Sequence, residues 1–105
     1  MSQFLYRIQP ARGDMLITGP TDFEANVVGR HFDYLKRLMA EGVVILAGRT
    51  MNCDESSFGI VIFNAPTDAA ALSIMTADPA VNEGVMRAEL FPYNTALIAE
   101  RNAGK

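Results

Sequence analysis

Two short, uninterrupted apolar runs in the middle of the chain constrain its fold more than any other feature. Residues 43–47 are Val-Val-Ile-Leu-Ala, and residues 60–63 are Ile-Val-Ile-Phe. Both runs have the length and the β-branched content of strands, which we expect over residues 43–51 and 59–64, and the polar residues between them predict a hairpin with a long loop. Neither run alternates apolar with polar positions, so we expect both faces of these strands to be buried.

The two ends of the chain each predict a further strand. Residues 4–9 have a strand pattern that Pro10 and Gly13 end. Residues 85–94 have a second such pattern and follow a glycine at position 84. The chain therefore contains four expected strands.

Two helices are expected between these strands. Thr21 to Glu24 have the Ser/Thr-x-x-Glu form of a capping box, and apolar positions then recur at helical spacing until Gly42. Thr67 is a suitable cap for an Ala-rich helix that reaches about residue 76, and Asp78-Pro79 interrupts it before a short helical turn. The expected order is β-α-β-β-α-β.

This order predicts an α+β domain of ferredoxin-like type, an antiparallel sheet with two helices on one face. Two helices leave the other face of the sheet uncovered, although the apolar runs predict that it is buried. A second copy of the chain is the simplest cover, because closed two-fold dimers are the commonest oligomers. We therefore expect a homodimer.

Composition limits the remaining classes. The 105 residues, half of them hydrophobic, fit a single domain over residues 1–105, with a loosely ordered tail over about 97–105. The net charge of −3 disfavours nucleic acid as a partner, since phosphate neutralisation dominates that binding. The apolar runs are far shorter than the ~20 residues that span a membrane. No basic stretch precedes an apolar segment at the N-terminus, so a cytoplasmic location is expected.

Metal and cofactor sites are not indicated by the sequence. One His and one Cys cannot form the usual ligand sets, and the carboxylates show no metal-binding spacing. The dinucleotide, phosphate-loop and nucleophile-elbow motifs are all missing. We expect neither a metal nor a cofactor.

His31, the only histidine, lies between Val28 and Leu35 on the apolar stripe of the first expected helix. Imidazole exchanges a proton near neutral pH, as a general acid/base requires, and a carboxylate partner would fix its tautomer. A buried, hydrogen-bonded histidine without catalytic role fits the same position. Asp78 before Pro79 has the arrangement of a helix N-cap, although a carboxylate can also accept from an imidazole at the same time.

Arg49 and Tyr93 are weaker candidates for substrate binding. Arg49 lies at the end of the second expected strand, where its planar guanidinium could bind an anionic group or could simply be solvated. Tyr93 lies on the last strand and could donate from its hydroxyl near a pocket, or could be a half-buried strand aromatic.

Several of these residues occur in motifs that resemble the YciI-like (YCII-related) family. The first is His31-Phe32-x-Tyr34-Leu35-x-x-Leu38-x-x-x-Gly42 followed by Ala47-Gly48, the second is Asp78-Pro79-x-Val81-x-x-Gly84-Val85, and the third is Phe91-Pro92-Tyr93. Together the resemblance covers roughly residues 4–96. One position departs from it, because the family often has Gly-Pro where this chain has Gly48-Arg49.

The resemblance implies a dimer of ferredoxin-like chains of the dimeric α/β barrel type, with His31 and Asp78 as its active site. It also implies a small-molecule ligand, and the best-defined chemistry of the family is a dehydrochlorinase step in the breakdown of aromatic compounds. We therefore expect a cofactor-independent enzyme with lyase- or isomerase-type chemistry on a small carbonyl or aromatic compound.

The residues also suggest two other functions. A non-catalytic dimeric protein that binds a small ligand or regulates a partner stays open. An RNA-recognition domain shares the order of elements, and residues 58–63 partly match one of its motifs. The match lacks the leading basic-Gly pair and a stacking aromatic at position 60, and the chain is acidic, so this function is not expected.

Overall fold

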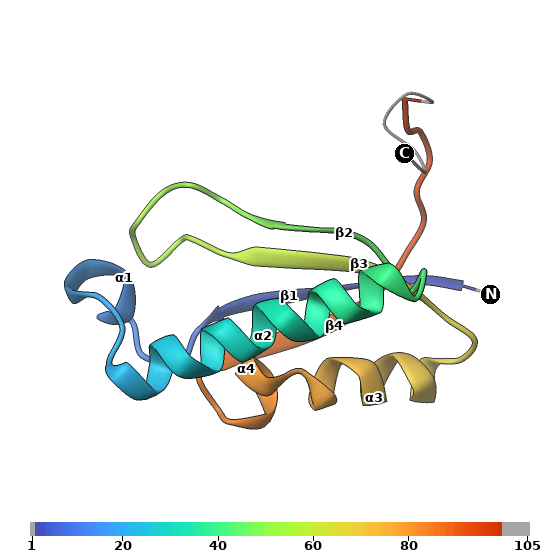
Figure 1. Cartoon of the computed structure of the whole chain (residues 1–105). Coiled ribbons are helices and arrows are strands. Elements are labelled where there is room, and N and C mark those ends of the chain that lie inside the picture. Colours follow the sequence, from blue (N-terminus) through green and yellow to red (C-terminus); the bar gives the residue numbers. More distant parts are fainter. Residues whose placement is uncertain (1, 100–105) are drawn as a thin grey trace.

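The computed structural model describes residues 2–99, and it contains four strands and four helices within them. The long helix α2 and the helix α3 lie on the same side of the sheet (Figure 1). The elements in chain order are β1 (Ser2–Pro10), α1 (Met15–Thr18), α2 (Asp22–Ala40), β2 (Val44–Arg49), β3 (Gly59–Ala65), α3 (Asp68–Ala77), α4 (Pro79–Asn82) and β4 (Met86–Tyr93).

The four strands form one antiparallel sheet in the order β2-β3-β1-β4. The N-terminal strand β1 therefore lies in the centre, where Tyr6 is opposite Val61 on one side and Leu90 on the other. The predicted α+β sheet with its two main helices on one face is confirmed.

Alternate side chains of the two central strands form the core beneath the helices. Tyr6 and Phe63 are completely buried and meet edge to face, with ring centroids 5.6 Å apart. Helix α2 contributes Leu35 and Leu38 to this core, and α3 contributes Ala71 and Met75. The period of two along β1 explains why Phe4, Tyr6 and Ile8 share this face.

Local capping defines the helices as the sequence predicts. The Thr21 side chain accepts from the backbone N–H of Glu24, and the Glu24 carboxylate accepts from that of Thr21, so the capping box is confirmed. Gly42 follows α2 with a φ of 80°, which suits glycine. Helix α1 was not predicted, because a single turn of four residues has no apolar period.

Within a single chain β2 is not buried on both faces, and its cover by a second copy stays a prediction. This strand is at the edge of the sheet, and only Val44 in it is buried. Its pairing with β3 contains an irregularity, since Val44 is opposite Phe63 and Leu46 is opposite Ile62. Ile45 is therefore an extra residue, as in a β-bulge.

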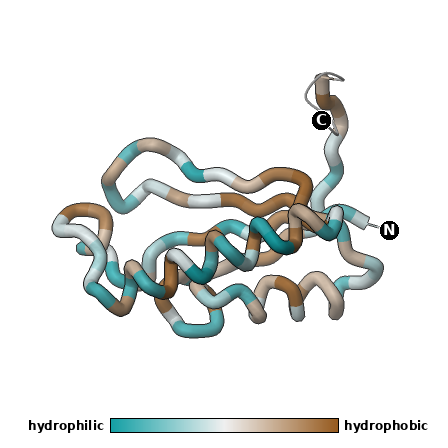
Figure 2. The backbone as a smooth tube through the Cα atoms, viewed as in Figure 1, coloured by the Kyte–Doolittle hydropathy of each residue, from teal (hydrophilic) through white to brown (hydrophobic). Residues whose placement is uncertain are grey.

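The face of the sheet away from the helices carries an apolar row. This row consists of residues that are opposite one another across all four strands: Leu46, Ile62, Leu5 and Phe91. Leu46 is 47% exposed and Phe91 43% exposed, so the row is incompletely covered in a single chain. Strongly hydrophobic positions also continue along neighbouring parts of β2 and β3 (Figure 2).

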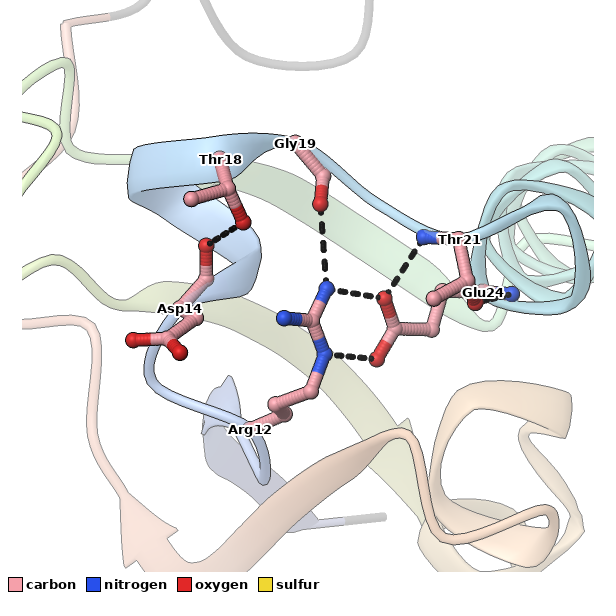
Figure 3. A network of polar contacts seen from close by, with 6 residues as sticks. All are labelled: Arg12, Asp14, Thr18, Gly19, Thr21 and Glu24. Carbon is pink, nitrogen blue, oxygen red and sulfur yellow. Dashed lines mark hydrogen bonds and ion pairs between the residues drawn. The ribbon is translucent and has the colours of Figure 1, made fainter.

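An ion pair anchors the segment that contains α1 to the start of α2 (Figure 3). Arg12 donates from Nε and a terminal nitrogen to the two oxygens of Glu24, at 2.9 and 2.7 Å, and also donates to the carbonyl of Gly19 at 3.0 Å. The Arg12 hydrogen bond first, and the Thr21 backbone N–H second, lower the pKa of Glu24 from 4.5 to about 2. Glu24, which belongs to the capping box of α2, thus also holds the preceding loop through Arg12.

The sequence also predicts a loosely ordered C-terminal tail and apolar runs too short to span a membrane. Residues 94–99 form no helix or strand, and most of the tail expected over residues 97–105 lies outside the described residues. Among the described helices, none is both long enough and apolar enough to cross a membrane.

The Arg12–Glu24 pair predicts a stability that depends on pH. Because the pKa of Glu24 is lowered in the folded state, its contribution is complete above pH 4.5 and is lost as the pH falls through about 2. Glu24→Gln should therefore be less stable than the wild type at pH 7, and the difference should shrink steadily below pH 4.5. Thermal unfolding of both proteins at pH 7, 5, 4 and 3 measures it.

Glu41→Gln provides the control, since the Glu41 carboxylate is exposed and pairs with Arg37 at 4.0 Å. It should leave the melting temperature nearly unchanged at each pH. A constant difference between Glu24→Gln and the wild type across this range would show that the ion pair does not stabilise the loop.

Candidate active site

His31 meets Asp78 between the first long helix and the α3–α4 junction. Its Nδ1 lies 2.7 Å from Oδ2 and 2.8 Å from Oδ1 of the carboxylate. The imidazole side chain is 13% exposed and the carboxylate is not exposed at all. Residues 47 positions apart in the sequence thus form a close polar pair.

Besides His31 on α2, two other elements supply hydrogen bonds to the Asp78 carboxylate. The hydroxyl of Tyr6 donates to Oδ2 at 2.6 Å, and the backbone N–H of Ala80 donates to Oδ1 at 2.9 Å. Asp78 is the N-cap of α4, with Pro79 at the first helical position. Asp78 therefore caps a helix and contacts His31 at the same time.

Tyr6 belongs to this site, and the sequence analysis missed it. It is a core residue of β1 between Phe4 and Ile8, so its pattern indicates only a buried strand aromatic. Burial first, and the negative Asp78 second, raise the pKa of the Tyr6 hydroxyl far above its ordinary value. The hydroxyl thus stays protonated and acts as a donor to the carboxylate.

The contact with Asp78 defines which nitrogen of a neutral His31 imidazole carries the proton. A carboxylate accepts a hydrogen bond from Nδ1–H, which leaves the lone pair of a neutral imidazole on Nε2. Nε2 has no hydrogen-bond partner among the described residues. This tautomer is the one that a general base at Nε2 requires.

A pocket of about 960 Å³ lies between α2, the α1 segment and the β2–β3 hairpin, and His31 lines it. Asp78 does not line this pocket, because it is buried behind His31. Apolar side chains form most of the lining, among them Val28, Phe32, Leu35, Met39, Phe58 and Ile60. Such a pocket suits a small, largely apolar molecule with one polar group near the imidazole.

Arg49 and Tyr93 have different positions relative to this pocket. Arg49 is exposed and lines it. Tyr93 is not part of the lining, is 39% exposed and pairs with Gln3 across the sheet. Alternation along β4 explains this, since Leu90 packs into the core while Phe91 and Tyr93 occupy the opposite face. The structure therefore does not bring Tyr93 together with His31.

A metal site is not apparent in this region. Within residues 2–99, no three His, Cys, Asp or Glu side chains lie close enough together to hold a metal ion. The chemical groups that the pocket offers are the imidazole of His31, the cations of Arg49 and Lys36, and the hydroxyl of Ser57.

The fold and the site together define a small α+β domain with one antiparallel sheet and a His–Asp pair beside an apolar pocket. Residues 7–94 match the model of the YCII-related domain. The chain belongs to this family, as the sequence motifs predict. A comparison with curated proteins finds no match.

Three solved structures to which this chain is similar are named as enzymes. The chain is similar to 5-chloro-2-hydroxyhydroquinone dehydrochlorinase from Burkholderia phenoliruptrix, solved with 2,5-dihydroxybenzoquinone, with a TM-score of 0.65, 17% identity and coverage of 88% of this chain and 93% of that one. Muconolactone isomerase gives a TM-score of 0.62 and 14% identity, over 93% of this chain and 96% of the isomerase. SnoaB, a cofactor-independent oxygenase from Streptomyces nogalater, gives a TM-score of 0.51 and 10% identity, over 93% of this chain and 95% of SnoaB.

The Tyr6–Asp78 hydrogen bond predicts a specific loss of stability. Tyr6→Phe keeps the ring in the core but removes one donor from a fully buried carboxylate, and it should lower the free energy of unfolding by about 1.5–3 kcal/mol. Tyr34→Phe is the matched control, because the Tyr34 hydroxyl donates to the neutral carbonyl of Ile74 at 2.8 Å. It should lose less, about 0.5–1.5 kcal/mol.

Denaturant unfolding of both variants and the wild type measures these differences. Equal losses for Tyr6→Phe and Tyr34→Phe would mean that the carboxylate gains nothing particular from the Tyr6 hydroxyl.

Proposed function

We propose that this chain is a cofactor-independent enzyme in which His31, held by Asp78, is a general acid/base acting on a small carbonyl or aromatic compound. The observation that carries the proposal is the 2.7 Å contact between Nδ1 and a fully buried carboxylate, at the wall of a pocket large enough for such a compound. Asp78 orients the ring and favours the imidazolium that forms when Nε2 accepts a proton.

The reaction proposed is of lyase or isomerase type. Nε2 removes a proton from a carbon next to a carbonyl, and the electron pair of the broken C–H bond is delocalised into an enolate. Return of the proton to another atom completes an isomerisation, whereas departure of a leaving group with its electron pair completes an elimination. In the elimination the pair of the C–H bond forms the new double bond, the leaving group keeps the pair of its own bond, and Nε2 afterwards releases the proton to water. Neither sequence passes electrons to an external acceptor, so neither requires a redox cofactor.

The named structural relatives support this choice of chemistry. A dehydrochlorinase eliminates and an isomerase moves a double bond or a proton, and both proteins have this fold. The third, SnoaB, is a cofactor-independent oxygenase. The sequence of this chain likewise contains no cofactor-binding motif.

We also propose that the active form is a homodimer, packed through the face of the sheet away from the helices. This face carries the apolar row of Leu46, Ile62, Leu5 and Phe91, whose outer members are about half exposed in one chain. Contiguous exposed apolar surface of this kind marks an interface. A second copy offers the same row, so two-fold packing of sheet on sheet buries both rows together.

The catalytic proposal predicts that His31→Asn abolishes proton transfer. The wild type should speed the incorporation of deuterium from D₂O at carbons next to the carbonyl in some members of a panel of small cyclic ketones, lactones and hydroxyquinones, as followed by NMR. His31→Asn should reduce that rate by about 100-fold or more, the usual range for a lost general base. Arg30→Gln, a neighbouring change at an exposed pair with Glu83, should leave it unchanged.

Both variants need a melting temperature beside the rate. Asn keeps a polar contact in a similar volume, so His31→Asn should remain folded at the assay temperature. Binding of panel members by the wild type without any exchange or turnover would favour the non-catalytic ligand-binding function instead.

The dimer proposal predicts a mass in solution of twice the 11.5 kDa of one chain. Leu46→Glu places a charge in the proposed interface and should give a monomer. Leu72→Glu is the control, since Leu72 is comparably exposed, at 50%, but lies on α3 on the helix side. Light scattering after gel filtration measures all three masses, and a monomeric wild type at micromolar concentration would refute the proposal.

A further inference from the structure

The charge of the pocket has the opposite sign to that of the chain. The protein has a net charge of −3, yet the pocket lining contains no Asp or Glu. Its ionisable members are His31, Lys36 and Arg49, all basic. An apolar pocket whose only charges are cationic selects for a molecule that is itself apolar with an anionic group.

Arg49 has a further property that most cations of this chain lack. It makes no ion pair with any carboxylate among residues 2–99, and its one hydrogen bond is a 3.5 Å contact with the carbonyl of Thr50. Five other cations do pair with carboxylates: Arg7, Arg12, Arg30, Lys36 and Arg37. The guanidinium of Arg49 is thus available to a ligand.

The register of the sheet places Arg49 on the pocket side. Arg49 is opposite Gly59, two residues from Val61, which faces the helices as part of the core. Residues two apart on a strand share a face, so Arg49 projects from the same face as the pocket. Gly59 lets Ile8 and the backbone of Gly48 pack closely against it, because a Cβ there would lie 3.1 Å from Cγ1 of Ile8 and 3.3 Å from the carbonyl oxygen of Gly48.

Two different walls of the pocket supply the imidazole and the guanidinium. His31 lines the pocket from α2, and Arg49 lines it from the end of β2. Lys36 is less available, since its Nζ lies 5.2 Å from the centre of the Phe32 ring and 3.9 Å from the Asp33 carboxylate. A planar guanidinium matches a planar carboxylate through two parallel hydrogen bonds.

We infer that the pocket binds a monocyclic organic carboxylate, whose carboxylate group pairs with Arg49 while its ring lies against the apolar lining. In this orientation the ring extends from the β2 wall toward His31. The inference deepens the proposed function, on which it rests only for the role of His31, because selective binding requires no turnover.

Calorimetric titration with a matched pair of probes tests this inference. The probes are 2-hydroxybenzoate and 2-hydroxybenzamide, which share the ring and the hydroxyl and differ in charge. The wild type should bind the carboxylate at least about tenfold more tightly, as expected for one charge-assisted pair. Arg49→Gln should remove this preference and leave the affinity for the amide unchanged.

One further variant completes the experiment. Arg87→Gln is the charge control, since Arg87 also lacks an ion pair among residues 2–99 but does not line this pocket, and it should keep the preference. A wild type that shows the preference but speeds no proton exchange would overturn the catalytic proposal alone. Equal affinity of the wild type for both probes, no binding of either at millimolar concentration, or an equal loss for both probes in Arg49→Gln would overturn this inference.

Discussion

The buried carboxylate of Asp78 joins parts of the chain that are remote in sequence. It accepts from the Tyr6 hydroxyl on β1, the His31 imidazole on α2 and the Ala80 backbone N–H on α4. A carboxylate without exposed surface is tolerated only when its oxygens are well supplied with donors, because burying an unpaired charge is strongly unfavourable. The site and the packing of the helices on the sheet therefore depend on the same group.

Helix α2 has two different apolar surfaces. One surface, with Leu35 and Leu38, packs into the core and brings His31 to Asp78. The neighbouring surface, with Phe32 and Met39, remains about half exposed and lines the pocket. The Arg12–Glu24 pair holds the loop that closes one end of this pocket, since Met15 and Pro20 belong to the lining.

The sequence predicts the local structure well and the three-dimensional relations less well. The capping box at Thr21, the Asp78-Pro79 helix start and the order of strands depend on neighbouring residues, so pattern and capping rules identify them. Tyr6 could not be identified as a partner of Asp78, because the two are 72 positions apart and its strand pattern indicates only burial. The motifs placed His31 and Asp78 in one region, and their functional roles remain a proposal.

The exposed positions of β2 and the placement of Tyr93 outside the pocket lining have a common physical origin. Apolar content predicts that a strand is covered but not which of its residues the same chain covers, and β2 lies at the sheet edge. Likewise, the assignment of Tyr93 to the pocket needed the face on which β4 places it. Side-chain alternation fixes that face only once the pairing register is known.

The bulge at Ile45 determines which side chains of β2 face the helices. Because Ile45 has no partner on β3, Leu46 is opposite Ile62 on the outer face and Arg49 is opposite Gly59 on the pocket side. Regular pairing from Val44 onward would instead place Leu46 opposite Val61, on the helix side, and Arg49 on the outer face. Loss of the codon for residue 45 would therefore straighten the strand and leave both faces as they are, whereas loss of the bulge with the codon retained would exchange the two faces while the number of strands stays the same.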